Sequence, residues 1–260
     1  MKENLLDTTF IIPIRLDSIT RLENIVATVN HLLRNFKTNI IILESSGFCN
    51  KFIKRLLPSS IKYVFIRDLD CVFYRTKYLN ILSKMVTTPY IGIWDSDIII
   101  DKNQIHDCIL KLRSGDYDIA YPYVGLFLDT GKILRDLYIE HPNISMLKRH
   151  KTKMELLYGE NMIGGAILVN KEKYALSGYE NERFYGWGPE DGERFFRWKA
   201  LGFRIYRSKG ELFHLSHSRD INGTNRSNIQ RRIMQRELQE NKVSNKNEIL
   251  IKIANFYYES

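Results

Sequence analysis

Cysteine, signal-like segments and long apolar runs are scarce in this chain, and each absence excludes a class of protein. The three cysteines, Cys49, Cys71 and Cys108, form no CxxC pair, so a disulfide framework or a zinc ribbon is disfavoured and a reducing compartment is favoured. No apolar run approaches the roughly 18 residues that a membrane span needs. The acid-containing start, Met1–Asp7, does not have the pattern of a signal peptide. We therefore expect a cytoplasmic protein, either free or at the inner face of the cell membrane.

What the chain does contain is enough apolar material for a substantial core. It has 260 residues, of which 44% are hydrophobic and 12% aromatic, and this suits one large domain or one domain with an appendage. The net charge of +9 suits a phosphate-bearing substrate, a nucleic acid or an anionic membrane surface. Part of this excess is concentrated in 226–252, which weakens the argument for a general phosphate-attracting field.

Short apolar runs alternate with amphipathic segments along most of the chain. Strands are predicted at 8–16, 39–43, 61–66, 90–94, 119–124, 163–169 and 203–207. Helices are predicted from Ser18 or Asp17 to Leu33, and at 48–57, 73–86, 103–113, 171–177 and 189–201. The segment 126–160 has no clear period and is expected to be helix or loop, and 225–260 is expected to form one or two helices broken near Ser244. This alternation predicts an α/β fold with a mostly parallel sheet, which binds ligands at the carboxyl ends of its strands.

Two carboxylates follow the most apolar of these predicted strands. Asp95 and Asp97 stand one residue apart within Ile91–Ile100. Carboxylates placed this way can bind a hard divalent cation that bridges the phosphates of a nucleotide, and one of them can contact a ribose hydroxyl. An acidic turn that caps the next helix explains the same residues.

Basic side chains accompany these strand ends. Arg15 follows the first predicted strand, and Arg75 and Lys77 lie on the helix that leads to Asp95. The guanidinium of arginine suits phosphate oxygens and stacks on a base. Because Arg75 and Lys77 are two residues apart, at most one of them faces a ligand from a helix. Solvated surface charges are the alternative interpretation.

A second acidic cluster follows an unusual aromatic context in Gly186–Asp191. The flanking glycines allow close approach of the backbone, and Trp187 between them is suited to form an apolar wall beneath a sugar ring. Glu190 and Asp191 come in the first turn of a helix, where one of them can accept a proton from an attacking hydroxyl. The helix start lowers the pKa of such an acid and the adjacent acid raises it, so the sequence leaves the balance open. An ordinary acidic helix start is the alternative.

A histidine pair, His214 and His217, comes after the acidic cluster. Neutral imidazoles are frequent ligands of metals such as manganese and zinc, and a spacing of three allows both to reach one ion. The other four histidines lack such a context and are interpreted as surface or core residues.

These motifs, taken in order, resemble the β-1,4-galactosyltransferases and the galactosyl- and N-acetylgalactosaminyltransferase domains of bacterial polysaccharide synthases. The similarity covers about residues 8–220 and rests on the blocks 10–15, 73–80, 94–97, 164–165, 186–191 and 214–220. Among them, Gly-Trp-Gly-x-Glu-Asp and His-Ser-Arg-Asp are specific, whereas Asp-x-Asp is common. The resemblance implies a GT-A fold, a UDP-sugar donor and an inverting transfer that depends on manganese.

The resemblance also implies roles for individual residues. Asp97, His214 and His217 would be the metal ligands, and Asp191 would be the catalytic base. The candidate substrate-binding residues are Pro13, Arg15, Arg75, Asp95, Gly164, Gly165, Trp187 and Glu190.

Three positions depart from the family pattern. Where the animal enzymes have a methionine ligand, this chain has His214, which is a harder ligand and favours a shift in metal preference. Gly192 replaces an acid that often follows the base and holds the acceptor, and Asp17 replaces a second basic residue of the first loop. These departures place the acceptor in question more than the donor.

The function expected from the sequence is transfer of galactose or N-acetylgalactosamine from the UDP-sugar to a saccharide or lipid-linked glycan, in polysaccharide or surface-glycan synthesis. Residues 1–220 would form the GT-A domain and 221–260 a C-terminal helical extension, whose basic side chains could contact a membrane. No nucleic-acid motif accompanies them. The alternatives are a nucleotidyltransferase acting on a sugar phosphate, and a non-catalytic basic module that binds a nucleotide sugar or a glycan.

Overall fold

The structure is a computed structural model that describes residues 2–218 and 227–256. Its strands are β1 (Glu3–Ile14), β2 (Phe36–Ser46), β3 (Lys62–Arg67), β4 (Tyr90–Trp94), β5 (Ile98–Ile99), β6 (Ile119–Tyr121), β7 (Phe127–Asp129), β8 (Glu155–Leu156), β9 (Ala166–Asn170), β10 (Ile205–Arg207) and β11 (Leu212–His214). Its α-helices are α1 (Ile19–Asn35), α2 (Phe52–Leu56), α3 (Arg75–Met85), α4 (Lys102–Arg113), α5 (Gly131–Glu140), α6 (Ile144–Arg149), α7 (Lys171–Leu176), α8 (Glu190–Ala200), α9 (Asn228–Val243) and α10 (Lys246–Phe256), and the short 3-10 helix η1 covers Lys151–Lys153.

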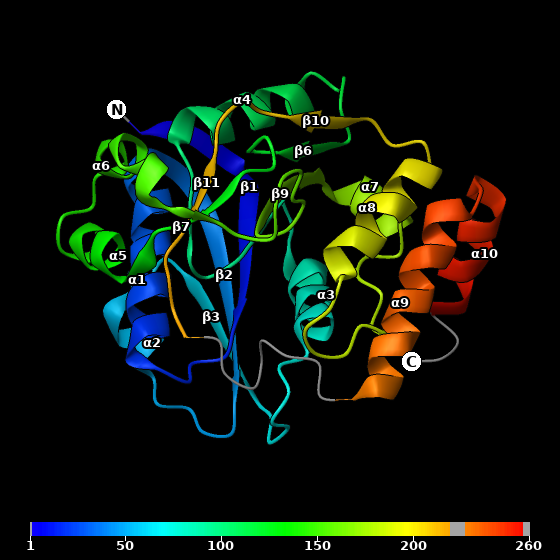
Figure 1. Cartoon of the computed structure of the whole chain (residues 1–260), viewed down its shortest axis with the longest axis horizontal. Coiled ribbons are helices and arrows are strands. Elements are labelled where there is room, and N and C mark those ends of the chain that lie inside the picture. The colour runs from blue at the N-terminus through cyan, green and yellow to red at the C-terminus, as the bar shows by residue number, and fades with distance from the viewer. Residues whose placement is uncertain (1, 219–226, 257–260) are drawn as a thin grey trace.

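A seven-stranded sheet in the order β10-β6-β9-β4-β1-β2-β3 forms the centre of the fold, with helices packed around it (Figure 1). The pairs β3–β2, β2–β1, β1–β4 and β6–β10 are parallel, and β9 runs antiparallel to both β4 and β6. The predicted α/β fold with a mostly parallel sheet is therefore confirmed. The carboxyl ends of β1, β2, β3 and β4 meet at one edge of this sheet, where the sequence places its arginines and carboxylates.

Strand β1 lies inside the sheet between β4 and β2, and its apolar run is buried on both faces. Phe10, Ile11 and Ile12 are fully buried, and the Phe10 ring meets Trp94 edge-on with 5.2 Å between ring centroids. Gly92 makes this packing possible, because a Cβ at that position would lie 2.5 Å from Cδ1 of Phe10. Full burial of each such side chain contributes roughly 1.5–3 kcal/mol, so the core fixes the strand that leads to Asp95.

Pro13 lies close to the end of β1, as predicted. The β1–β2 pairing continues to Ile14, whereas the β1–β4 pairing ends at Ile11. A proline is tolerated there because its missing N–H is not needed by β4. The strand also begins at Glu3, earlier than predicted, and Arg113 pairs with Asp7 at 2.8 Å on this polar extension.

The segment 126–160 contains strands that the sequence did not predict. A second sheet has the order β5-β11-β7-β8, with β11 between β5 and β7. Its strands are two or three residues long, too short to show a period of two, and their partners lie far away in the chain. This sheet matters for function because β11 delivers His214 beside Ile98, next to Asp97.

The last two described helices pack on α8 (Figure 1). Leu201 shares an apolar cluster with Ile249 and Ile253 of α10, and the Asn241 side chain donates a hydrogen bond to Glu193 at 2.6 Å. The break between α9 and α10 falls at Ser244–Asn245, as predicted. The predicted domain boundary at 220 and 221, together with Arg219 and Arg226, lies outside the described residues. No described helix is long and apolar enough to cross a membrane.

Candidate active site

Three predicted metal ligands lie together beside the end of β4. The ligand atoms of Asp97, His214 and His217 are all within 4.8 Å of one another. Nε2 of His217 is 3.0 Å and Nε2 of His214 is 3.8 Å from Oδ2 of Asp97. The backbone holds this arrangement, because the Leu215 N–H donates to the Asp97 carbonyl at 2.8 Å.

The hydrogen bonds of the two imidazoles suit metal binding. Nδ1 of His214 lies 2.6 Å from Oδ1 of Asp129, and Nδ1 of His217 lies 2.7 Å from the Ser218 carbonyl. A carboxylate and a carbonyl accept hydrogen bonds, so Nδ1 carries the proton in both rings. Nε2 of both rings then faces Asp97: it donates to that carboxylate when the ring is protonated and presents a lone pair to a metal when the ring is neutral, with Nδ1 held by an orienting partner as in metal sites. Two nitrogens and one carboxylate oxygen are a donor set that Mn²⁺ accepts.

The two carboxylates of the Asp-Ser-Asp motif have different electrostatic surroundings. Burial raises the pKa of Asp97, but the charge of His214 and the hydrogen bond from His217 outweigh it and hold that pKa well below its usual range. Burial dominates at Asp95 and raises its pKa, although Arg75 opposes the shift. Asp95 accepts hydrogen bonds from Arg75 at 2.7 and 3.2 Å, and it is not among the three clustered ligands. The motif thus divides into one carboxylate facing the histidines and one facing an arginine.

Arg75 connects this strand end to the second acidic cluster. It begins α3, and besides Asp95 its guanidinium lies 3.5 Å from Oε1 of Glu190 and 3.8 Å from Oδ1 of Asp191. The acid pair at the start of α8 therefore faces the carboxyl end of β4. Lys77, two residues further on, is exposed and lies over the Tyr74 ring at 5.9 Å. As predicted from their spacing, only one of the two basic residues faces the site.

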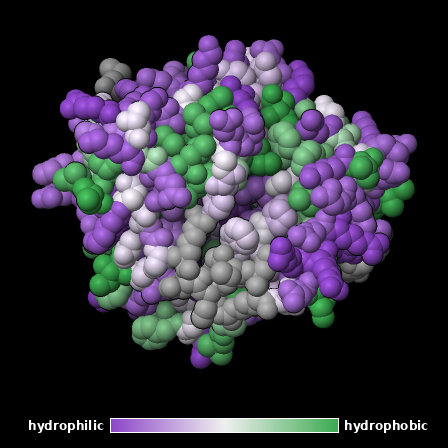
Figure 2. Space-filling view, viewed as in Figure 1, coloured by the Kyte–Doolittle hydropathy of each residue, from purple (hydrophilic) through white to green (hydrophobic). Residues whose placement is uncertain are grey.

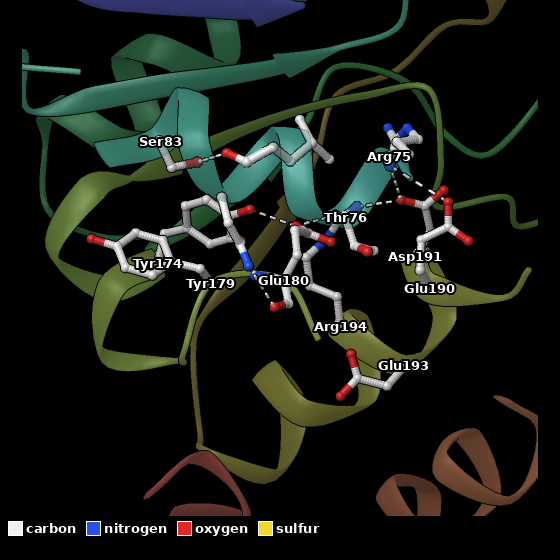
Figure 3. Close-up of polar contacts among 12 residues, drawn as sticks. Arg75, Thr76, Ser83, Tyr174, Tyr179, Glu180, Glu190, Asp191, Glu193 and Arg194 are labelled. Carbon is white, nitrogen blue, oxygen red and sulfur yellow. Dashed lines mark hydrogen bonds and ion pairs between the residues drawn. The ribbon is translucent and has the colours of Figure 1, made fainter. Parts of the chain in front are cut away.

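The carboxylate of Asp191 is held by a second, fully buried arginine. Figure 3 shows Arg194 between Asp191 and Glu180. It forms a close ion pair with Asp191, and its Nη1 lies 2.5 Å from Oε1 of Glu180. Glu180 is itself fixed by the Tyr174 hydroxyl, which donates to it at 2.5 Å. Separating a buried charge from its partner strongly destabilises the folded protein. The contacts from Tyr174 through Glu180 and Arg194 therefore hold the Asp191 carboxylate in one orientation.

Two glycines opposite α8 leave room for the site. A Cβ on Gly164 would lie 2.5 Å from Oδ2 of Asp191, so this carboxylate oxygen occupies the space of a missing side chain. Gly165 has φ +79°, a conformation that favours glycine, and its carbonyl accepts from the Asp95 N–H at 2.8 Å. Gly164 and Gly165 therefore join the acid pair to the Asp-Ser-Asp loop.

Trp187 lies in the loop before α8 and is 45% exposed, which is unusual for so large an apolar side chain. Gly186 has φ +85°, and a Cβ there would lie 2.8 Å from Val72. Gly188 makes room for the Met234 sulfur of α9. The glycines are thus required by the packing of the loop, and the indole leaves an apolar surface open to solvent three residues before the acid pair.

Pro13 and Arg15 come at the end of β1, and the contacts of Arg15 are with the ends of the neighbouring strands β2 and β3 and with Phe73. Arg15 donates to the Ser45 carbonyl at 3.2 Å, lies 3.8 Å from Asp68, and stacks over Phe73 at 5.6 Å. Pro13 is buried in β1. Among the described side chains, Nη2 of Arg15, Nη1 of Arg75 and Oε2 of Glu190 are buried without a hydrogen-bond partner. Such atoms are costly unless a ligand or water satisfies them, so all three suit contacts with a polar substrate.

Arg194, Glu180 and Asp129 are site residues that the sequence did not reveal. Arg194 could have been found from its spacing of three after Asp191 on the same predicted helix. Glu180 and Asp129 carry no local signal, because their partners Arg194 and His214 are brought to them only by the fold.

Glu190 should make the stability of the protein depend on pH. Burial and the charge of Asp191 raise its pKa from 4.5 to about 8. Between these values the unfolded carboxyl is ionised while the folded one holds its proton, so stability falls as pH rises through this window. We expect Glu190→Gln to match the wild type below pH 4.5 and to become more stable toward pH 8, by on the order of a few kcal/mol in the free energy of unfolding. Thermal unfolding over a pH series measures this, and parallel curves for the two proteins would contradict it.

Comparison with known sequences relates the part of the chain that carries these clusters to galactosyltransferases. A family profile described as "N-terminal domain of galactosyltransferase" matches residues 146–220, which include the acid pair and both histidines. The β-1,4-galactosyltransferase 7 proteins of Homo sapiens and Mus musculus are each 28% identical over 120 residues, which are 46% of this chain and 31% of theirs. The matched stretch thus spans about a third of the length of these relatives.

Solved structures with the same fold align with nearly the whole chain. The catalytic domain of Drosophila β-1,4-galactosyltransferase 7 in complex with xylobiose aligns with a TM-score of 0.52 at 16% identity, covering 94% of this chain and 83% of that one. A mutant of the same enzyme in complex with manganese, UDP-Gal and xylobiose aligns with a TM-score of 0.54 at 16% identity, covering 87% and 77%. The chain has a GT-A fold.

A second enzyme with this GT-A fold comes from bacteria. The glucosyl-3-phosphoglycerate synthase of Mycobacterium tuberculosis, in complex with Mn²⁺, UDP and phosphoglyceric acid, aligns with a TM-score of 0.52 at 15% identity, covering 90% of this chain and 76% of that one. The predicted GT-A fold and the resemblance to β-1,4-galactosyltransferases are both confirmed. The roles of the individual site residues stay predictions.

Proposed function

We propose that this protein is an inverting glycosyltransferase that moves galactose or N-acetylgalactosamine from a UDP-sugar to a hydroxyl of a saccharide acceptor. One observation carries the proposal: the Asp97, His214 and His217 cluster and the Glu190–Asp191 pair flank the same strand end, joined through Asp95 and Arg75. A donor diphosphate held on the first side places its sugar toward the second. The sequence match to galactosyltransferases favours the galacto configuration of the donor.

Asp97, His214 and His217 would hold the metal ion, for which Mn²⁺ fits the donor set. When bound, the ion would supply a positive charge that stabilises the leaving diphosphate. Arg75 would orient the donor, because its Nη1 is buried without a hydrogen-bond partner. Asp95 fits a ribose contact or support of the loop. Arg15 would contact the nucleotide, with Pro13 shaping the strand end before it.

Asp191 would take the proton of the acceptor hydroxyl as that oxygen attacks the anomeric carbon and UDP leaves from the opposite face. Arg194 holds its Oδ1, and Gly164 leaves space for its Oδ2. Glu190, whose pKa is about 8, would be protonated at neutral pH and donate a hydrogen bond to a sugar hydroxyl. Trp187 would form the apolar wall beneath a sugar ring.

The acceptor class and the cellular setting belong to the same proposal. A saccharide or lipid-linked glycan in surface-polysaccharide synthesis fits the resemblance to bacterial polysaccharide synthases, and a cytoplasmic location fits the low cysteine content. We retain the division into a GT-A domain at 1–220 and a helical extension at 221–260 as part of the proposal.

A donor screen tests this function. The 260-residue chain is incubated with UDP-galactose, UDP-N-acetylgalactosamine or UDP-glucose, with and without Mn²⁺, and release of UDP is measured. We expect release to require Mn²⁺ and to be fastest with one of the two galacto-configured donors. Pyrophosphate release from a nucleoside triphosphate and a sugar phosphate would instead indicate a nucleotidyltransferase. Binding of a UDP-sugar without turnover in the presence of saccharide acceptors would indicate a binding module.

A further inference from the structure

The connection from β2 into α2 exposes an unusual group of apolar side chains. The chain has 13 phenylalanines. Among those that the structure describes, Phe48 and Phe52 are the exposed ones, with 76% and 48% of their surface accessible to solvent. Leu56 on α2 is 55% exposed, and Leu69 in the next connection is 77% exposed. Gly47 brings the two connections together, since a Cβ there would lie 3.4 Å from Cδ2 of Leu69. Phe52 and Leu56 are four residues apart on α2 and so share one face of that helix, while Leu69 lies beside the connection that carries Phe48.

Positive charge accompanies these side chains. Residues 45–67 contain five basic residues and no acid: Lys51, Lys54, Arg55, Lys62 and Arg67. All five are exposed, and none forms an ion pair with another residue of the described chain. The acids that flank this stretch each have a partner: Glu44 accepts from Tyr63 at 2.7 Å, Asp68 accepts from Tyr78 and lies near Arg15, and Asp70 accepts from Tyr185. Asp68 and Asp70 stay charged on either side of Leu69, so the surface is apolar with an excess of basic over acidic side chains.

The position of this surface relates it to the site. Figure 1 shows the β2–α2 and β3–α3 connections at the lower edge of the molecule, where the carboxyl ends of β2 and β3 point. Figure 2 shows hydrophobic residues along the same edge. Asp68, in the second connection, lies 3.8 Å from Arg15, so the surface borders the residue predicted to contact the nucleotide.

We propose that this surface, made by Phe48, Phe52, Leu56 and Leu69 with Lys51, Lys54, Arg55 and Arg67, binds the interface of an anionic lipid bilayer. Aromatic and aliphatic side chains enter the boundary between headgroups and acyl chains, while lysine and arginine contact the phosphates. A protein partner of opposite charge would satisfy the cations but leaves two exposed phenylalanines on loop and helix ends unexplained. The geometry directs the carboxyl edge of the sheet, with its candidate site, toward the membrane surface.

The basic C-terminal helices, which also expose apolar side chains such as Val243 and Ile251, are the competing surface, but several of their cations are already paired. Arg236 pairs with Glu240 at 2.7 Å, and Lys252 lies 2.7 Å from Glu240 and 3.5 Å from Glu237. Lys242 lies over the Phe196 ring at 5.3 Å. Three of the tail cations are therefore already engaged within the protein, whereas those of the α2 surface are not.

Vesicle flotation tests this inference. The 260-residue chain is mixed with vesicles of phosphatidylcholine alone or of phosphatidylcholine with phosphatidylglycerol, without donor or acceptor, so that the outcome is separate from that of the transfer assay. We expect the protein to bind only the vesicles that contain phosphatidylglycerol, and we expect this binding to weaken as salt is added. Lys54→Glu combined with Arg55→Glu should lower the partition coefficient by about tenfold or more. Phe48→Ser combined with Leu69→Ser should also lower the partition coefficient, because it removes two apolar side chains that would enter the bilayer interface. Both side chains are exposed, so the substitutions leave the core intact.

A matched charge control separates the two surfaces. Arg231→Glu combined with Arg232→Glu changes the same number of charges at exposed positions of α9 and should retain wild-type binding. The proposal is overturned if the wild type does not bind anionic vesicles, if the α2 double variant binds as the wild type does, or if the α9 variant is the one that loses binding. Equal melting temperatures of the variants show that loss of binding is not loss of fold.

Discussion

Replacing Asp191 by asparagine is expected to lower the rate of sugar transfer by about 10²–10⁴, while binding of the UDP-sugar with Mn²⁺ is retained. The substitution keeps the shape of the side chain and removes its ability to accept a full proton. Donor binding should persist because the cluster of Asp97, His214 and His217 is left intact and Arg75 keeps its closer ion pair with Asp95 at 2.7 Å. Steady-state transfer rates together with calorimetric titration of the donor measure the two effects separately.

A second variant protects this test against a failure to fold. Asp191→Asn leaves the fully buried Arg194 with a weaker partner, which costs stability. Gly164→Ala leaves every charge in place but puts a Cβ 2.5 Å from Oδ2 of Asp191, so it displaces the base alone. We expect a lower kcat for both variants and wild-type activity for Gly47→Ala, where a Cβ makes only ordinary contacts, with 3.4 Å as its shortest distance. Full transfer activity in Asp191→Asn would remove the proposed base.

The two carboxylates of the Asp-Ser-Asp motif should respond differently to substitution. Asp97→Asn is expected to weaken Mn²⁺ binding by more than the roughly 10–100-fold that loss of an orienting partner costs, because it removes the one charged ligand of the cluster. Asp95→Asn should leave the affinity for Mn²⁺ within a few-fold and weaken the donor instead, since Asp95 faces Arg75. Electron paramagnetic resonance titration of free Mn²⁺ measures the affinity in both variants.

The orienting carboxylate provides a further check of the same cluster. Asp129 accepts from Nδ1 of His214 at 2.6 Å, so Asp129→Asn should cost less Mn²⁺ affinity than Asp97→Asn. Removal of the metal from the wild type with a chelator should abolish transfer, and added Mn²⁺ should restore it. Equal losses of Mn²⁺ binding in Asp95→Asn and Asp97→Asn would contradict the division of roles.

Much of the main sheet could be predicted because its strands are long apolar runs bounded by turn residues. Residues 90–94 and 203–207 match observed strands closely, and the helix cap predicted at Ser18 is formed, with the Arg21 N–H donating to its hydroxyl at 3.2 Å. The second sheet could not be predicted. Its segments become extended only when β11 pairs with β5 and β7. A segment of two or three residues is too short to show the alternation of polar and apolar residues that predicts a strand.

The candidate site shows the same division. Asp97, His214 and His217 could be proposed as partners from their types and order, and the structure brings them together. The pKa of Glu190 could not be set from the sequence, because the helix start and the neighbouring acid act in opposite directions. Burial of the Glu190 carboxyl group in the folded protein decides this balance and raises its pKa to about 8.

The sequence by itself determined the α/β class, the strand ends that carry Arg15, Asp95 and Asp97, and the residue types available for metal and proton chemistry. These follow from apolar periodicity and from side-chain chemistry, which are local properties. Only the tertiary structure decided that Arg75 bridges Asp95 and Glu190, that Arg194 holds Asp191, and that Phe48 and Phe52 stay exposed. Ion pairing and burial depend on which distant segments become neighbours, and that is fixed by packing of the whole chain.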